Sequence, residues 1–269
     1  MKQILKCLLA ALLPLTGGAQ TAAPPDGGRP VEHQWLYGIG YNQVLDTYLS
    51  PLNYCGPSLS VWHRSERLAR WGRDRVTVQG RFGGQISNLE AEADADKAWD
   101  GHFTAGVAWL YNWQPAPRTR LAAGASADLT AGFTYLLKGG NNPGQGRLHT
   151  DFGLTALAQQ DFRLRRRNCA VRAQLDLPLM GAMFSPEYGQ SYYEIFSLGH
   201  YSHNVRFTHP FNAPSAHWEL TVRVPLAGAT LTAGYLGDIR QSHVNGLKHH
   251  AWNHQFVIGY VRRLQLLRP

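Results

Sequence analysis

The chain has 269 residues, of which 44% are hydrophobic and 16% are charged, and its formal net charge is +8. This length suffices for one large all-β domain or two small ones. Beyond the amino-terminal segment no stretch approaches about 18 consecutive apolar residues, which excludes helical membrane spans. The few cysteines exclude a scaffold held together by disulfides.

The amino-terminal segment has the pattern of a secretory signal peptide. Lys2 and Lys6 form a basic region, Leu8 to Leu15 form an apolar core, and Gly17 to Ala19 form a small-residue cleavage site. The apolar core is well short of the roughly 20 residues that a membrane-spanning helix needs. We therefore predict that residues 1–19 are a signal peptide and that the protein is exported.

The residues after this segment divide into a leader and one domain. Residues 20–33 are rich in Ala, Pro and Gly, which predicts a flexible leader. Residues 34–269 are expected to fold as a single domain. The basic residues of this domain alternate with apolar ones or sit in turns such as Arg165 to Arg167. In an exported protein this pattern favours contact with anionic lipid or sugar rather than with nucleic acid.

Hydrophobic residues recur with period two along most of the domain, which is the pattern of β-strands. Alternation alone also fits a soluble sandwich, whose strands usually have about 5 or 6 residues. The segments here are much longer and could cross a bilayer, which takes about 9 to 11 residues of a tilted strand. The expected strands are residues 34–48, 56–68, 74–89, 99–113, 118–137, 147–163, 168–179, 216–226, 229–241 and 250–264.

Aromatic residues cluster near the ends of these segments, as in the interfacial girdles of transmembrane barrels. Examples are Trp35, Tyr111 and Trp252. The sequence therefore predicts an antiparallel transmembrane β-barrel of about ten strands, with short periplasmic turns and longer external loops. The apolar residues at alternate positions of these strands are expected to face lipid. They include Val107, Trp109, Leu121, Phe133 and Ile258.

Residues 180–215 are too many for an ordinary loop, and such long segments are usually functional or packed on the body of the protein. Residues 191–198 and 204–207 could each be a strand, so a barrel of twelve strands is the alternative. The segment is rich in aromatic residues, and an exposed loop of this kind would be a sticky surface. We predict that Tyr192, Glu194 and Phe196 fold inward or extend the wall, with Glu194 paired to an inward arginine.

The alternate positions of the strands that are expected to face the lumen contain ionisable residues of both charges. Buried charges persist only when they are paired and hydrogen-bonded, so a structural network that fills a narrow barrel is the favoured interpretation. A substrate pathway is the alternative. The predicted lumen network consists of Arg120, Asp128, Asp161, Arg172, Asp176, Glu219, Arg223, Asp238 and Arg240; Arg75, Arg81 and Arg163 share the same parity.

Other chemistry has weaker support in the sequence. His200 to Asn204 contains the residue types of a serine hydrolase without a convincing spacing, and residues 90–96 look like a solvated acidic loop. His243, His249, His250 and His254 gather near the last external loop but lack a tight metal-binding spacing, so no metal and no cofactor are predicted. Cys55 and Cys169 are expected at opposite ends of the barrel as two free thiols.

At residues 45–56 (LDTYLSPLNYCG) and 191–196 (SYYEIF) the chain resembles an uncharacterised family of outer-membrane barrels from Gram-negative anaerobes, a domain of unknown function. The resemblance extends to Asn245, Gly246 and the closing residues 256–260. It implies the barrel fold and the outer membrane, and it supplies no activity and no catalytic residues.

Three functions stay open at this point. The first is a non-enzymatic outer-membrane barrel, structural or a narrow conduit. The second is a membrane-embedded hydrolase that acts on lipid or peptide, and the third is an external binding barrel. The expected partners are outer-membrane lipid and lipopolysaccharide, with a small ligand or glycan at the external mouth.

Overall fold

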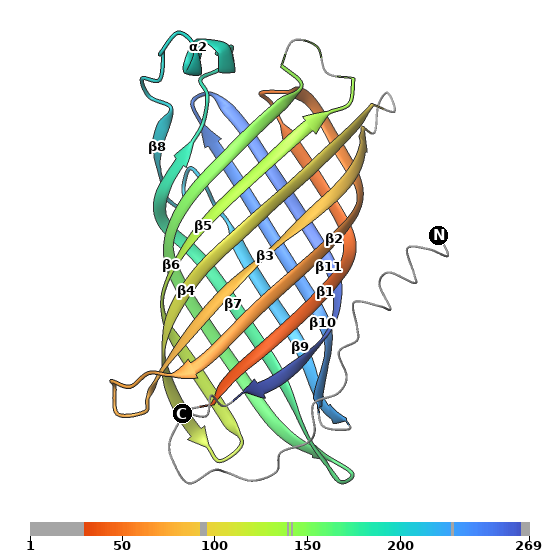
Figure 1. Cartoon of the computed structure of the whole chain (residues 1–269), viewed down its shortest axis with the longest axis vertical. Coiled ribbons are helices and arrows are strands. Elements are labelled where there is room, and N and C mark those ends of the chain that lie inside the picture. The colour runs from red at the N-terminus through yellow and green to blue at the C-terminus, as the bar shows by residue number, and fades with distance from the viewer. Residues whose placement is uncertain (1–29, 92–95, 139, 141, 227–228, 265–269) are drawn as a thin grey trace, which may run out of the picture.

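The computed structural model describes residues 30–91, 96–138, 140, 142–226 and 229–264. These residues form a closed antiparallel barrel whose strands are tilted around a common axis (Figure 1). Its ten long strands are β1 (Val31–Asp46), β2 (Ser50–Leu68), β3 (Val76–Ala91), β4 (Lys97–Ala116), β5 (Thr119–Leu136), β6 (Gly144–Leu164), β7 (Arg167–Phe184), β9 (Ala216–Leu226), β10 (Ala229–Val244) and β11 (Leu247–Leu264). The helix α2 (Tyr192–Phe196) and the short strand β8 (Val205–Thr208) lie between β7 and β9 in the sequence.

The first and last strands close the ring. β1 pairs with β11 from Val31 opposite Leu264 to Asp46 opposite His249, and each other long strand pairs with its neighbours. β1 begins and β11 ends at one end of the barrel, which we call the termini end. The helix α2 lies at the other end, the α2 end (Figure 1). The predicted barrel of ten strands is therefore confirmed, and the alternative of twelve strands is wrong.

The strand period sorts the side chains into two faces. Trp109, Leu121, Phe133 and Ile258 are exposed on the outer face, as predicted. Their immediate neighbours in the sequence point inward, where many polar residues lie beside small apolar clusters such as Ala108, Leu110, Ala122 and Leu157. Because successive residues of a strand face opposite sides, each strand presents an apolar outer surface and a more polar inner one.

The strands reach further than the sequence indicated at several ends. β1 begins at Val31, so the predicted leader extends three residues too far. The predicted loop 242–249 is a two-residue turn in which Asn245 and Gly246 have φ values of 55° and 74°. Asn-Gly is the preferred pair for such a hairpin turn because both residues tolerate positive φ. The expected contrast between short turns and long loops therefore holds only in part.

The long segment after β7 forms one strand and one helix. β8 pairs with the last residues of β7, from Gly181 opposite Thr208 to Phe184 opposite Val205, and extends the wall on one side only. Tyr192 folds onto the barrel rim, where its hydroxyl accepts a 2.7 Å hydrogen bond from the backbone N–H of Gly146. The ring of Phe196 stacks on that of Tyr192.

Glu194 does not pair with an arginine among the described residues, so that prediction is wrong. Its carboxylate instead accepts hydrogen bonds from the backbone N–H and the hydroxyl of Ser191, at 2.7 and 2.8 Å. The backbone N–H of Glu194 donates a 3.2 Å hydrogen bond to the hydroxyl of Ser191, and together with the bond from the Ser191 N–H this forms the capping box at the start of α2. The hydrogen bonds to the carboxylate satisfy its charge locally. They lower the pKa of Glu194, because hydrogen bonds to a carboxylate favour its charged form.

Two further predictions concern cysteines and the signal peptide. Cys55 on β2 and Cys169 on β7 are not joined in a disulfide, as predicted. The expected signal peptide and most of the leader lie outside the described residues. No helix among the described residues is long and apolar enough to cross a membrane.

Candidate functional site

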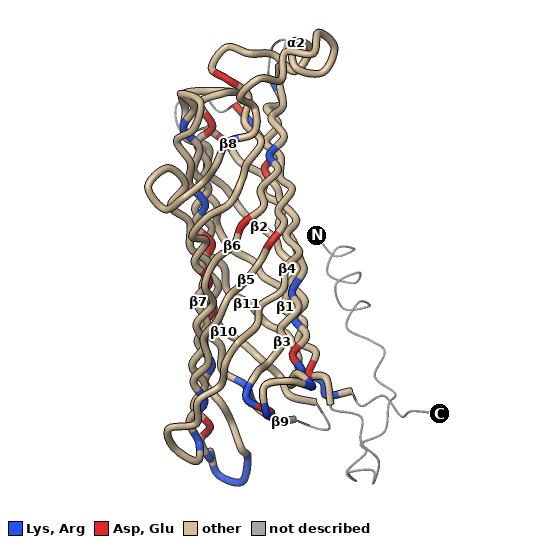
Figure 2. Tube along the Cα trace, turned by 90° about the vertical axis from the view of Figure 1, so that its left-hand side faces the viewer, with Lys and Arg blue, Asp and Glu red and all other residues tan. Residues whose placement is uncertain are grey.

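Charged residues are distributed along the whole length of the barrel wall (Figure 2). Many of them point into the lumen and gather in two layers. On the side of β1, β2 and β11 the lumen between these layers is filled by short polar side chains. There Ser58 donates a 2.8 Å hydrogen bond to Asn253, and Gln255 donates one of 3.0 Å to Ser58. These side chains occupy part of the lumen between the two layers.

The layer nearer the termini end is built around Glu66 of β2 and Arg172 of β7. Arg172 has no exposed surface and pairs with Glu66. Arg120 lies 3.3 Å from the other oxygen of Glu66. Gln79 and Gln174 exchange hydrogen bonds of 3.1 and 3.0 Å across the lumen and also contact this pair. This inner layer joins β2, β3, β5 and β7 across the interior.

The same layer continues toward β1 and β9. Arg64 lies 2.8 Å from Glu219, which also accepts a hydrogen bond from Gln34. Arg223 donates to Gln34 and to Glu32, each at 2.7 Å. The charged groups of β1, β2 and β9 are thus paired on the inside of the wall, as buried charges require. We call this set of inward side chains the termini-side layer. It consists of Glu32, Gln34, Arg64, Glu66, Gln79, Arg120, Arg172, Gln174, Glu219 and Arg223.

A second layer lies near the α2 end, and we call it the α2-side layer. The guanidinium of Arg147 on β6 lies 2.6 Å from Asp46 and 2.9 Å from Asp100. Asp100 also accepts hydrogen bonds from Thr134 and from Asn42. All five residues are buried. One arginine therefore holds the carboxylates of β1 and β4 together.

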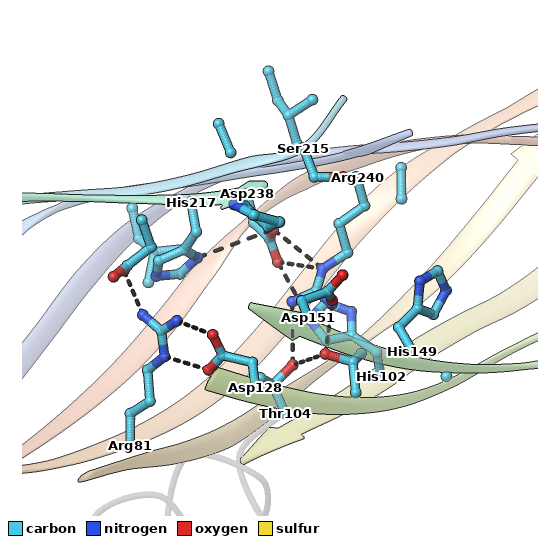
Figure 3. A pocket seen from close by; sticks show the side chains of 18 of the residues that line it. Arg81, His102, Thr104, Asp128, His149, Asp151, Ser215, His217, Asp238 and Arg240 are labelled. Carbon is cyan, nitrogen blue, oxygen red and sulfur yellow. Dashed lines mark hydrogen bonds and ion pairs between the residues drawn. The ribbon is translucent and has the colours of Figure 1, made fainter. Parts of the chain in front are cut away.

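A cavity of about 110 Å³ lies between the two layers (Figure 3). Arg64 and Glu219 line the cavity toward the termini end, and Arg147 lines it toward the α2 end. The walls are formed by residues of all ten long strands and by Ala213 and Ser215.

Two arginines organise the charges of the cavity (Figure 3). Arg81 binds Asp128 and Asp176, and its shortest contact to each carboxylate is 2.5 Å. Arg240 lies 3.1 Å from Asp238 and donates to the hydroxyls of Thr104 and Thr130, each at 3.2 Å. Arg81 thus links β3 to β5 and β7, and Arg240 links β10 to β4 and β5. The strands that surround the cavity are therefore tied together through it.

Two histidines and one tryptophan complete the lining around Asp238. The ring nitrogens of His102 and His217 lie 3.3 and 4.0 Å from its carboxylate oxygens. The indole ring of Trp62 lies beside both imidazoles, at centroid distances of 6.1 and 5.6 Å. Trp62 is buried, and its Nε1 has no hydrogen-bond partner among the described residues.

The structure places most of the predicted network inside the barrel. Arg172, Asp176, Glu219, Arg223 and Asp238 are buried, and Asp128, Arg240 and Arg120 take part in the pairs described above.

Three residues of the inward parity are exposed instead. Asp161, a member of the predicted network, lies at the termini end, where the side chain of Gln159 donates a 2.9 Å hydrogen bond to its carboxylate. Arg75 and Arg163 are also exposed. These residues stand next to turns, beyond the level at which the wall encloses a lumen.

Six charged residues that the layers depend on were not predicted from the sequence. Five of them stand within the predicted strands and follow their inward parity, so the parity alone could have identified them: Asp46, Arg64, Glu66, Asp100 and Arg147. The sixth, Glu32, has the inward parity of β1 but stands in the segment predicted as a leader.

The remaining sites offer less chemistry. A wider vestibule of about 900 Å³ opens at the termini end between Glu32, Trp113, Arg120 and Asp161. The described residues contain no group of three or more His, Cys, Asp or Glu side chains arranged to hold a metal ion. The cavity between the layers is therefore the candidate functional site.

The family model described as "Protein of unknown function (DUF3316)" matches residues 4–269. The chain belongs to this family. No curated protein matches it. Among solved structures, this DUF3316 chain is similar to the outer membrane protease OmpT from Escherichia coli, with 8% identity, a TM-score of 0.48, and coverage of 92% of this chain and 100% of that one. It is also similar to the translocator domain of the autotransporter NalP from Neisseria meningitidis, with 11% identity, a TM-score of 0.43, and coverage of 98% and 94%.

Proposed function

We propose that the chain is a non-enzymatic barrel of a Gram-negative outer membrane whose lumen is closed to through-flow. The apolar outer face supports the membrane location, because a soluble barrel would expose polar residues there. Ring closure supports it further, since most backbone groups of the ten long strands are paired within the wall. The expected signal peptide is consistent with export to that membrane.

The proposal of a closed lumen rests on the termini-side layer. Arg172 and Gln79 are fully buried, and Gln174 and Glu219 are nearly so. Ions would have to disrupt the paired charges of this layer in order to pass, and breaking a buried pair is costly. Of the two non-enzymatic possibilities, this favours a closed barrel over a narrow conduit.

Conductance in planar lipid bilayers tests the proposal. The purified full chain is expected to insert without producing discrete conductance steps. The double variant Gln79→Ala/Gln174→Ala removes the neutral side chains that span the layer, and it is expected to conduct. The matched variant Gln114→Ala/Gln160→Ala alters exposed glutamines and is expected to stay silent. Regular conductance steps from the unaltered chain would contradict the proposal.

The hydrolase alternative has little support from the cavity. Among the described residues, neither His102 nor His217 hydrogen-bonds a serine hydroxyl, which a nucleophile activated by histidine would require. The carboxylate of Asp238 that faces both imidazoles is already paired with Arg240. We therefore assign this cluster a structural and binding role.

A second candidate function is glycan binding at the external mouth. The α2 end exposes the side chains of Tyr188, Tyr193, Phe196 and Tyr201, and exposed aromatic residues of this kind mark interaction sites. The variant Tyr193→Ala/Tyr201→Ala is expected to lose binding to purified lipopolysaccharide core oligosaccharide. Equal binding by the variant and the unaltered chain would rule out this candidate. The variant Trp113→Ala, at the termini end, is the control.

A further inference from the structure

The barrel wall is incomplete between β7 and β10 in its half toward the α2 end. The ladder between β7 and β9 ends at Asp176 opposite His217, and the ladder between β9 and β10 ends at Ile239 opposite Ala216. β8 pairs only with residues 181–184 of β7. Residues 177–180 of β7 and residues 240–244 of β10 therefore face each other without a strand between them. We call this gap the seam.

Residues 209–215 cover the seam with few contacts to β10. The hydroxyl of Ser215 accepts a 3.3 Å hydrogen bond from the backbone N–H of Gln241, and the carbonyl of Asn212 accepts one of 2.7 Å from His243. Asn212 otherwise bonds with its own turn, through His209 and the carbonyl of Phe207. An irregular segment is unusual at the depth of a bilayer unless it lines a cavity.

The cavity reaches the seam. Its lining includes Ala213 and Ser215 of the covering segment, Leu177 and Pro178 of β7, and residues 239–241 of β10. These residues stand on both sides of the seam and in the segment that covers it. The cavity therefore extends to the seam and lies directly behind residues 209–215.

The outer surface around the seam is apolar. Phe211 is 95% exposed, and Phe152, Met180 and Phe207 are also exposed on the outer face. In a membrane this surface would contact acyl chains. A molecule dissolved in the bilayer could therefore keep an apolar chain outside the wall while its polar end enters the cavity.

The chemistry of the cavity indicates the kind of polar end. The indole Nε1 of Trp62 is a buried donor without a partner, which fits a ligand that accepts a hydrogen bond. The lining holds four arginines and six carboxylates, so it disfavours an anion. The cavity volume of about 110 Å³ suits a small polar end.

We propose that this cavity binds the uncharged, oxygen-bearing head group of a single-chain amphiphile, which enters sideways from the membrane through the seam. The proposal rests on the membrane location proposed above and adds a ligand and an entry route. Trp62 donates a hydrogen bond to the head group, and residues 209–215 control access. No covalent step is involved.

Binding of a radiolabelled monoacylglycerol to the full chain in phosphatidylcholine vesicles tests the site. Saturable binding is expected, at one molecule per chain. The fatty acid of equal chain length is expected to bind more weakly. Trp62→Phe keeps the ring but loses the N–H, so binding should weaken about fivefold. Trp109→Phe, on the outer face, should leave it unchanged. Absence of saturable binding, tighter binding of the fatty acid, or equal binding by Trp62→Phe would overturn the site.

A disulfide across the seam tests the route. In the variant Ser215→Cys/Gln241→Cys the oxidised form is expected to exchange monoacylglycerol at least tenfold more slowly, and reduction should restore the rate. The control Val222→Cys/Ala233→Cys joins directly opposed residues of the intact β9–β10 ladder and should exchange normally. Unchanged exchange in the oxidised seam variant would overturn lateral entry. Failure of the chain to insert into vesicles would instead refute the membrane location.

Discussion

Replacing Arg172 by alanine should destabilise the barrel by about 3 to 5 kcal/mol, the range found when one partner of a buried ion pair is removed. Arg172 has no exposed surface, and it contacts both Glu66 and Gln174. Its loss leaves Glu66 with Arg120 as its remaining close cation and also leaves a cavity in the wall. Urea unfolding of the chain refolded into lipid vesicles measures the effect.

The matched control for this prediction is Arg163→Ala on the neighbouring strand. Arg163 is exposed, so its removal should change the free energy of unfolding by less than about 0.5 kcal/mol. The double variant Glu66→Gln/Arg172→Met should lose less stability than the sum of its single variants, because contacting residues are not additive. A loss below about 1 kcal/mol for Arg172→Ala would show that the termini-side layer is not buried as described.

Replacing Arg147 by alanine is the second change with a large expected effect, again about 3 to 5 kcal/mol. One guanidinium separates Asp46 from Asp100, so its removal leaves two buried carboxylates without their cation. Arg147→Lys should recover only part of the stability, since an ammonium cannot bind both carboxylates with the fixed fork of arginine. Hydrogen exchange should report faster opening of β1, β4 and β6 near the α2 end.

An exposed pair near the same end provides the comparison. Lys138 lies 3.1 Å from Asp96, and the lysine side chain is 70% exposed. Exposed pairs of this kind contribute about 0 to 1 kcal/mol. Lys138→Ala should therefore be nearly neutral. Equal losses for Arg147→Ala and Lys138→Ala would contradict the buried position of the α2-side layer.

The fold could be predicted because the strand period is strong and regular. Along β5, Leu121, Leu129 and Phe133 share one parity and Asp128 the other, which fixes both the strand and its two faces. The ends of strands could not be placed as well, because alternation continues into residues that rise above the bilayer. This error hid Glu32, which stands in the predicted leader, whereas Asp46 and Arg147 stand within the predicted strands.

The candidate site could be predicted only as a set of inward charges. Parity identifies Asp176 and Arg240 as inward, but it does not give their height or their partners in the barrel. Those depend on how far each strand is shifted against its neighbours. The seam depends on where β9 begins, and no local pattern marks the missing strand above Ala216.

The helix α2 did have a signal in the sequence. Ser191 followed three residues later by Glu194 is the pattern of a capping box. The aromatic residues of the same segment favoured a strand or an inward fold, and the charge of Glu194 suggested an arginine partner. In the structure the carboxylate is satisfied locally, so it needs no partner from the lumen.

Cysteine accessibility along β5 in intact cells tests the membrane-spanning barrel most directly. Leu129 and Phe133 are exposed on the outer face, whereas Thr130 and Thr134 are buried inside. Single cysteines at Leu129 and Phe133 should react with a lipid-soluble maleimide and resist a membrane-impermeant one. Cysteines at Thr130 and Thr134 should be spared by the lipid-soluble reagent. Rapid labelling of Leu129→Cys and Phe133→Cys by the impermeant reagent would contradict the membrane-spanning barrel.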